Sequence, residues 1–234
     1  ISKMPYFKGY ISDLGGPSAN MYRMKGIDEQ LCLKCTRASC IFPNKCKNLN
    51  FNHRPLISLY EKAEKIPNIK KISIGSGIRY DMLLDENKEK QNKYGLIEYT
   101  NRLIRFHVSG RLKVAPEHTE DHVLKSMRKP SFDYFLSFKK VFDSINQTHQ
   151  LNQQLIPYFI SSHPACRLED MHNLHKKIKK LNYKLEQVQD FTPTPLTLSS
   201  VIFYTGLNPY SGEKIFSETA IDKKRQQNQY FFKK

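Results

Sequence analysis

The sequence predicts an α/β protein with a parallel sheet. Short apolar strands alternate along the chain with amphipathic stretches, which is typical of βαβ units joined by right-handed crossovers. Each predicted strand ends in a polar cluster that contains glycine or proline. With 234 residues, of which 39% are hydrophobic, the chain is long enough for one large domain with a substantial core.

Three strands are predicted in the first half of the chain. The first spans 9–14 and leads into Gly15 and Gly16, and a cysteine-rich loop follows. Pro55 suits the first turn of a helix, and the residues after it show helical spacing of apolar side chains. The strands are predicted at 9–14, 71–75 and 111–115, and the helices at 55–66 and 94–106.

The second half continues the alternation. Thr119 is predicted to cap a short helix whose first turn is acidic, as the helix dipole favours. Further helices are predicted at 132–145 and 167–181, and strands at 154–160 and 186–191. Residues 201–204 are predicted to form another short strand or a loop edge.

Five successive strands end in unusual polar clusters. In a (β/α) barrel, the carboxyl ends of the strands form the active face, so these clusters are expected to meet at one mouth. Ordinary turn chemistry would produce one or two such ends, and we therefore interpret the set as a site. The clusters occupy 13–17, 76–79, 116–119, 161–164 and 190–193.

The formal net charge is +16, from 38 Lys and Arg against 22 Asp and Glu. Such a charge favours anionic partners, either nucleic acid or a phosphorylated substrate. The alternative is that lysine-rich helix faces are simply solvated. No apolar run reaches the roughly 18 residues that span a bilayer, so no membrane partner is expected. The opening at Ile1 suggests a piece of a longer protein.

Four of the five cysteines are clustered within fifteen residues. Clustering in a large, otherwise cysteine-poor chain indicates metal or cluster binding in a reducing compartment, which predicts a cytoplasmic protein. Cys32, Cys35, Cys40 and Cys46 follow a C-x2-C-x4-C-x5-C spacing. Thiolates at such spacing suit zinc and iron–sulfur equally, and four idle thiols are the alternative. Cys166 is expected to be a packing residue.

Two histidine pairs also have spacings that could place two ligands on one helix face. His118 and His122 are four apart, and His172 and His175 are three apart. Because no third ligand is evident for either pair, we interpret them as solvated helix histidines.

Several long phrases resemble radical S-adenosylmethionine (SAM) enzymes, most closely the uncharacterised YgiQ-like family. The phrases are YISDLGGPSANMY, KISIGSGIRYDML, LKVAPEHTEDHVLKSMRKP, LIPYFISSHPACRLEDM and QVQDFTPTPLTLSSVIFYTG. Leu124–Pro130 has a weaker likeness to methylthiotransferases. The resemblance implies a partial TIM-like (β/α)6 radical-SAM barrel over 1–210, comprising strands two to six, with a cysteine-rich insertion at 32–46. The basic extension at 211–234 could be partly disordered.

The resemblance also implies a cofactor chemistry. Such enzymes hold a [4Fe–4S] cluster through a C-x3-C-x2-C motif, and reductive cleavage of SAM at the cluster yields a 5′-deoxyadenosyl radical. A flavodoxin- or ferredoxin-type protein donates the electron. The motif is absent from this chain, and we expect it upstream of Ile1. The fragment alone is therefore expected to be inactive, and its substrate is unknown, although RNA would match the positive charge.

The resemblance assigns cofactor-binding roles to the strand ends. Gly15 and Gly16 would present backbone carbonyls to the SAM amino group, because glycine allows a ligand to approach closely. Lys113 or Arg128 would offset the methionyl carboxylate. The full implied set is Gly15, Gly16, Ser76, Arg79, Lys113, Glu117, His118, Arg128, Ser161, His163 and Gln189.

Two other functions remain open. The chain could be a basic, cysteine-centred module that binds zinc or RNA without catalysis, or a folded but inactive fragment. The aromatic residues do not interleave with Lys and Arg along one strand, as a base-stacking platform would require.

Overall fold

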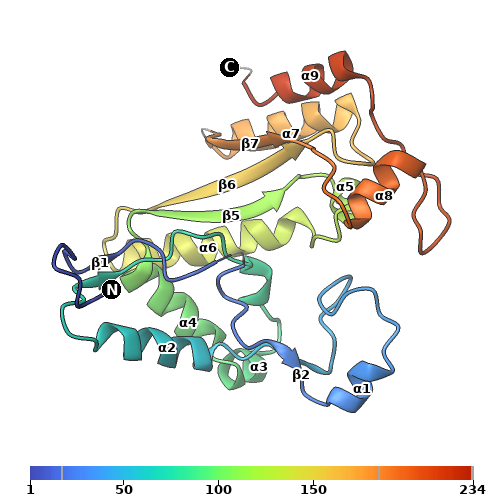
Figure 1. Ribbon diagram of the computed structural model, residues 1–234. Coiled ribbons are helices and arrows are strands. Elements are labelled where there is room, and N and C mark those ends of the chain that lie inside the picture. Colours follow the sequence, from blue (N-terminus) through green and yellow to red (C-terminus); the bar gives the residue numbers. More distant parts are fainter. Residues whose placement is uncertain (17, 184, 233–234) are drawn as a thin grey trace. The chain divides into compact units, whose positions relative to one another are not determined.

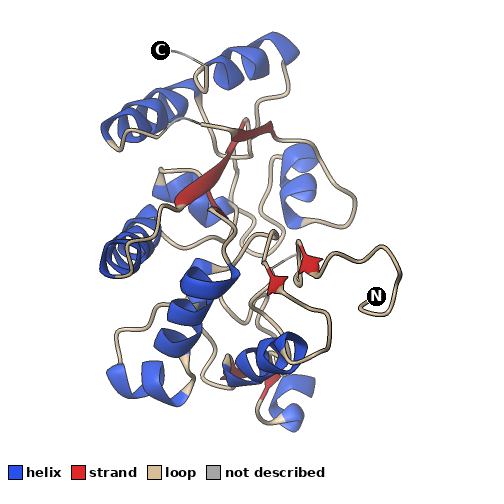
Figure 2. Ribbon diagram, turned by 90° about the vertical axis from the view of Figure 1, so that its left-hand side faces the viewer, coloured by secondary structure: helices blue, strands red, loops and turns tan. Residues whose placement is uncertain are grey.

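The computed structural model describes residues 1–16, 18–183 and 185–232. It is a mixed α/β structure in which short strands are connected by longer helices and loops (Figure 1, Figure 2). The chain divides into two compact units. The first unit comprises 1–114 and 134–155, and the second comprises 115–133 and 156–234. The α/β class predicted from the alternating pattern is confirmed.

The first unit contains the N-terminal elements. Its strands are β1 (Tyr10–Ile11), β2 (Lys25–Gly26), β3 (Leu49–Asn50) and β4 (Lys71–Ile72). Its helices are α1 (Glu29–Leu33), α2 (Arg54–Glu64), the 3-10 turn η1 (Tyr80–Met82), α3 (Lys88–Lys93), α4 (Leu96–Arg102) and the π-helical turn η2 (Leu103–His107).

The strands β5 (Arg111–Glu117) and β6 (Gln154–Ser161) and the helix α6 (Phe132–Thr148) run across the division between the units. The remaining elements belong to the second unit. These are α5 (Asp121–Ser126), α7 (Leu168–Lys180), β7 (Gln187–Asp190), α8 (Leu198–Thr205) and α9 (Ile221–Gln229).

The strand pairs predicted from the alternating pattern are parallel. β1 pairs with β4, with Tyr10 opposite Lys71, and backbone bonds continue this line as far as Leu14 N to Ser73 O at 2.9 Å. A parallel bridge joins Ile78 to Val114 of β5. In the second unit β6 and β7 are also parallel, and the sheet order is β5-β6-β7. β2 and β3 form a separate antiparallel pair that the alternating pattern does not predict.

The core of the first unit lies under α2 and α4, which pack side by side (Figure 1). Helix α2 buries Leu56, Ile57 and Tyr60, the face that helical spacing predicts. A second apolar cluster lies beneath the cysteine-rich loop and is formed by Leu49, Phe51, Met82 and Leu96, with Met24, Ile41, Cys46 and Tyr94 packed against it.

The core of the second unit lies between its strands, α7 and α9. Phe159 of β6 and Met171 and Leu174 of α7 are fully buried. α9 packs on α7 and β7 (Figure 1) and buries Gln227. No helix in the described part of the chain is long and apolar enough to span a bilayer.

The prediction of a strand or loop edge at 201–204 is wrong, because these residues lie in α8. Thr197 caps this helix, since its side chain accepts a bond from the backbone N–H of Ser200. Gly206 ends the helix in the left-handed conformation at φ +68. The capping residues at both ends therefore outweigh the strand propensity of Val201, Ile202 and Phe203.

Candidate functional site at the strand ends

The ends of β1 and β4 are joined by the Asp13 side chain. Asp13 Oδ1 accepts a bond from the backbone N–H of Gly75 at 3.0 Å, and the Ser76 hydroxyl donates to Asp13 Oδ2. The pattern of polar strand ends in the sequence contained Asp13 but did not single it out. Its position fixes Ser76, one of the residues that the resemblance assigns, at the end of β4.

The two glycines after β1 differ in their surroundings. A Cβ added to Gly15 would lie 2.7 Å from Asp13 Oδ1 and 3.1 Å from the Ala19 Cβ, so glycine is required there by the chain's own packing. A Cβ on Gly16 would meet nothing within 4 Å. Internal packing thus explains Gly15, whereas Gly16 borders open space that a ligand can enter.

The charges at these strand ends favour an ionised Asp13. Burial opposes ionisation, but the Ser76 hydroxyl, the backbone N–H groups of Gly75 and Ser76, and the charge of Lys113 outweigh it and lower the pKa of Asp13. Lys113 is exposed on β5, and its backbone carbonyl accepts from Ile78 N at 3.3 Å. In the first unit Asp13 and Gly16 follow β1, Ser76 follows β4, and the charge of Lys113 on β5 acts on Asp13.

Arg79 is placed near the same strand end but is bound by its own chain. Its Nε donates to Asp81 at 2.8 Å, and its Nη2 lies 2.5 Å from the same carboxylate. Asn20 bonds both the backbone N–H and the carbonyl of Arg79, and lies 3.3 Å from His53. Burial lowers the pKa of His53 to about 4, so this histidine is a neutral support for the turn.

In the second unit, His118 follows β5 and is fully buried. Its Nδ1 accepts from Glu120 N at 3.1 Å, so the proton of the neutral ring is on Nε2, which lies 3.5 Å from Cys166 Sγ. Burial lowers the pKa of His118 to about 3 and raises the pKa of Cys166 to about 12. The pair is therefore neutral and is not an activated thiolate.

α9 completes this buried network. Gln227 Oε1 accepts from the Cys166 thiol at 3.2 Å and from Ser162 N at 3.0 Å, while its Nε2 donates to Cys166 O at 3.3 Å. Ser162 follows β6 with φ +58, a strained conformation for a residue other than glycine. The side chain of Gln227 therefore holds the backbone beyond the end of β6 in place.

Ser161 and His163 are likewise occupied by their own chain. The Ser161 hydroxyl donates to Asp190 at 3.0 Å and accepts from Asn228 of α9 at 3.3 Å. His163 Nδ1 donates to Pro164 O, and its Nε2 accepts from Ser199 of α8, both at 2.8 Å. Burial lowers the pKa of His163 to about 4. Both residues are buried, which suits a structural role better than ligand contact.

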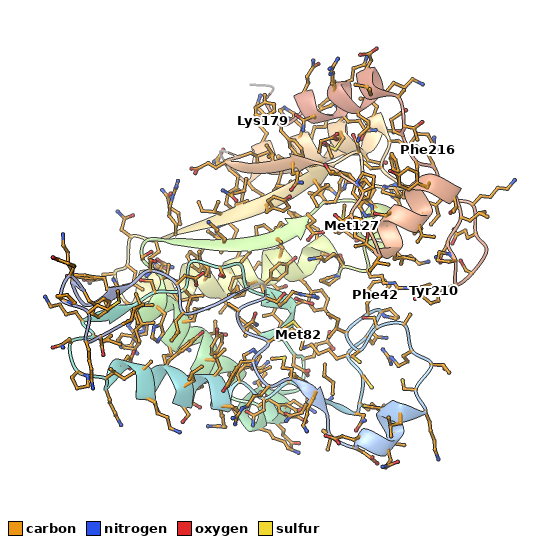
Figure 3. All side chains as sticks on the ribbon, in the orientation of Figure 1. Phe42, Met82, Met127, Lys179, Tyr210 and Phe216 are labelled. Carbon is orange, nitrogen blue, oxygen red and sulfur yellow. The ribbon has the colours of Figure 1, made fainter. Side chains whose placement is uncertain are left out.

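The other assigned residues of the second unit retain accessible surface. Glu117, at the end of β5 with φ +65, is paired with Lys129 at 2.7 Å. The guanidinium of Arg128 lies 4.5 Å from the ring centre of Tyr210, which lies on the segment after α8 (Figure 3). Gln189 is exposed and accepts from the Tyr158 hydroxyl.

The four cysteines of the cysteine-rich loop fall into two pairs of sequence neighbours, Cys32 with Cys35 and Cys40 with Cys46. Cys35 N donates to Cys32 O at 3.1 Å, and Cys46 N donates to Cys40 O at 2.7 Å, so each pair is closed by a backbone bond. Cys32, Cys35 and Cys40 are exposed, whereas Cys46 packs against the apolar cluster of the first unit. Arg37 connects the two pairs, because its guanidinium donates to Ser39 O and Asn44 O.

Two N–H groups point at sulfur atoms of this loop. Asn48 Nδ2 donates to Cys32 Sγ at 3.3 Å, and Arg37 N donates to Cys35 Sγ at 3.4 Å. Among the described residues, no three His, Cys, Asp or Glu side chains are close enough together to hold one metal ion. The metal site at these four cysteines therefore stays a prediction that requires the loop to close further.

The histidine pairs lie in the second unit, and the interpretation as solvated helix histidines is wrong for His118, which precedes α5 and is fully buried. His122 lies 3.2 Å from Asp170, and His175 Nδ1 donates to Tyr230 O at 3.0 Å. The ring of His172 packs edge-on against Tyr230.

No protein-family model matches the chain. It is similar to curated proteins named UPF0313 proteins, with 56% identity over 99% of the chain for one from Bacteroides thetaiotaomicron. The identity is 54% for one from Porphyromonas gingivalis and 40% for one from Methanocella arvoryzae. The chain spans 37% of the first two relatives and 36% of the third. It is thus similar to about a third of the length of proteins that carry the UPF0313 name.

Proposed function

We propose that this chain is the SAM-binding part of a radical-SAM enzyme, built as strands two to six of a (β/α)6 barrel. The observation that carries the proposal is the open space at Gly16, beside Asp13, Ser76 and Lys113 in the first unit. The parallel pairing of β1 with β4 and of β6 with β7, and the long phrases shared with that superfamily, support it.

The residues of the first unit suit the ends of a zwitterionic ligand. The Gly16 carbonyl would accept a bond from the amino group of SAM, since a Cβ at this position would meet nothing within 4 Å and glycine lets a ligand approach the backbone. Lys113 would offset the methionyl carboxylate, and Asp13 would hold the Ser76 hydroxyl in one orientation. The [4Fe–4S] cluster, when bound by upstream cysteines, supplies the electron that cleaves SAM to a 5′-deoxyadenosyl radical.

The strand ends of the second unit have two roles in this proposal. His118, Ser161 and His163 support the backbone, because each is buried and bonded to other parts of the unit. Glu117, Arg128 and Gln189 keep accessible surface, and the cofactor contacts that the resemblance implies for them stay predictions.

The full-length protein tests the proposal directly. Anaerobic reconstitution with iron and sulfide, followed by a strong reductant and SAM, should yield 5′-deoxyadenosine. A C-x3-C-x2-C motif in the polypeptide preceding Ile1 is expected as well. If a protein with a fully loaded cluster forms no 5′-deoxyadenosine, the reaction class is wrong.

The cysteine-rich loop favours a second metal centre, either zinc or an auxiliary iron–sulfur cluster. The N–H groups of Asn48 and Arg37 that point at Cys32 and Cys35 are the kind of donors that stabilise thiolates. A protein with serine at Cys35, Cys40 and Cys46 should lose one equivalent of metal, measured by elemental analysis, whereas serine at Cys166 should not. An unchanged metal content in the triple variant would exclude this centre.

The same measurement tests the alternative of a module that binds zinc or RNA without catalysis. That function requires zinc at the four cysteines and no SAM cleavage by the full-length protein. Iron with acid-labile sulfide at these residues would exclude it.

A further inference from the structure

The first unit carries a basic hollow on the surface between α2, β4 and η2. Its volume is about 450 Å³, and it is lined by Glu64, Ile69, Lys70, Lys71, Ile72, Arg105 and Phe106. The lining residues come from three segments that are up to 42 positions apart in sequence, from 64 to 106. The fold therefore gathers charges that are scattered along the chain.

Three of the lining side chains are exposed cations. Within the described residues, Lys70, Lys71 and Arg105 have no carboxylate at ion-pair distance. The one lining carboxylate, Glu64, is held by Arg102, and its Oε1 lies 3.5 Å from His107 Nε2. The hollow thus has an uncompensated positive charge that suits a phosphate group.

An aromatic ring lies beside these cations. Phe106 is 49% exposed although it is fully apolar, and the Arg105 guanidinium lies 4.8 Å from its ring centre. The Arg102 guanidinium lies 5.9 Å from the same ring. An exposed ring next to phosphate-binding side chains is the arrangement by which proteins bind nucleotides, since the base stacks on the ring while cations bind the phosphate.

We propose that this hollow binds a nucleotide, with the phosphate at Lys70, Lys71 and Arg105 and the base on Phe106. The nucleotide is either free or one unit of a single-stranded RNA, since both present the same phosphate and base. The net charge of +16 favours the polymer, because each neutralised phosphate releases counterions. The site is separate from the strand ends and does not depend on SAM binding.

The test measures binding of a fluorescein-labelled 12-residue oligouridine by fluorescence anisotropy across a salt series. The double variant K71A/R105A should weaken binding about tenfold at low salt and reduce the slope of log affinity against log salt by about 1.4, for two lost phosphate contacts. The matched control is K179A/K180A, which removes the same charge from an exposed turn of α7 (Figure 3).

Substitutions of Phe106 test the stacking. F106L keeps an apolar side chain and should weaken binding about tenfold, whereas F106Y keeps the ring and should bind as the parent protein does. Circular dichroism and thermal unfolding check that each variant is folded.

Competition separates the two sources of the ligand. Uridine monophosphate that displaces the RNA at equal nucleotide concentration assigns the hollow to free nucleotides, and much weaker displacement assigns it to RNA. Equal losses in K71A/R105A and K179A/K180A would contradict the site, because the binding would then be a general effect of charge. Absence of binding at low salt, or an unchanged affinity in F106L, would contradict it as well.

Discussion

The strand ends of the two units differ in their surroundings. In the first unit Gly16, after β1, borders open space, and Lys113 of β5 is exposed. In the second unit the residues at the end of β6 are bonded by α8 and α9, through Ser161, Ser162 and His163. Similar polar clusters in the sequence therefore differ in their surroundings, since Gly16 borders open space whereas Ser161, Ser162 and His163 are bonded within their own unit.

The largest expected effect is acid destabilisation, to which buried histidines of both units contribute. In the folded chain the pKa is about 4 for His53, about 3 for His118 and about 4 for His163. In the unfolded chain each pKa is near 6.5. Because folding lowers these pKa values, the contribution of the neutral histidines to the free energy of unfolding is fully present above pH 6.5 and is lost as the pH falls toward 4. Each histidine lowers the free energy of unfolding by about 1.4 kcal/mol at pH 5.5, and the three together lower it by roughly 4 kcal/mol.

Urea unfolding at pH 7 and pH 5.5, followed by circular dichroism, measures this loss. His118 and His163 belong to the second unit and His53 to the first. Burial also lowers the pKa of His107 in the first unit, so hydrogen exchange, corrected for intrinsic rates, should show lost protection in both units. H172Q, at an exposed histidine, is the control. Equal stability at the two pH values would contradict the neutral, buried state of these side chains.

The next effect concerns α9, whose Gln227 side chain bonds the backbone after β6. Q227A removes the acceptor of Ser162 N and the donor to Cys166 O, and buried unpaired groups should cost about 2 to 3 kcal/mol of the unfolding free energy. Q226A, at the exposed neighbour, should change it by less than about 0.5 kcal/mol. Similar small losses in both variants would show that α9 does not support the second unit in this way.

The smallest expected effect on stability is the difference between the alanine variants of Gly15 and Gly16. G15A places a methyl group 2.7 Å from Asp13 Oδ1, and such overpacking should cost about 1 to 2 kcal/mol of the unfolding free energy. G16A meets nothing within 4 Å and should cost less than about 0.5 kcal/mol. Thermal denaturation compares the two variants. A larger loss in G16A than in G15A would mean that the space beside Gly16 is filled.

The sequence predicts the long, regular elements well. β5, β6 and α7 lie within two residues of their predicted bounds, because their apolar periodicity agrees with their end residues. α1, α3 and α9 are short or polar and have little periodicity, so the pattern did not predict them. β1 and β4 are shorter than predicted, since only two residues of each form the ladder.

The site could be predicted only in part. The strand-end pattern includes Asp13 and Ser76, whose side chains bond to each other, but not Lys113, whose charge acts on Asp13. It could not distinguish Gly15 from Gly16, because the difference depends on the Asp13 and Ser76 side chains that fold against Gly15. Nor could it show that α9, about 60 residues further along the chain, reaches Ser161 and Ser162.

The SAM affinity of two variants tests the contrast between open and covered strand ends most directly. The full-length, anaerobically reconstituted protein is compared with its G16V and S161A variants by equilibrium dialysis with radiolabelled SAM. We expect G16V to bind SAM at least about tenfold more weakly, because its side chain enters the open space. S161A should lose stability but keep its SAM affinity, since Ser161 bonds only within its own unit. Unchanged affinity in G16V, or a selective loss of affinity in S161A, would contradict the account.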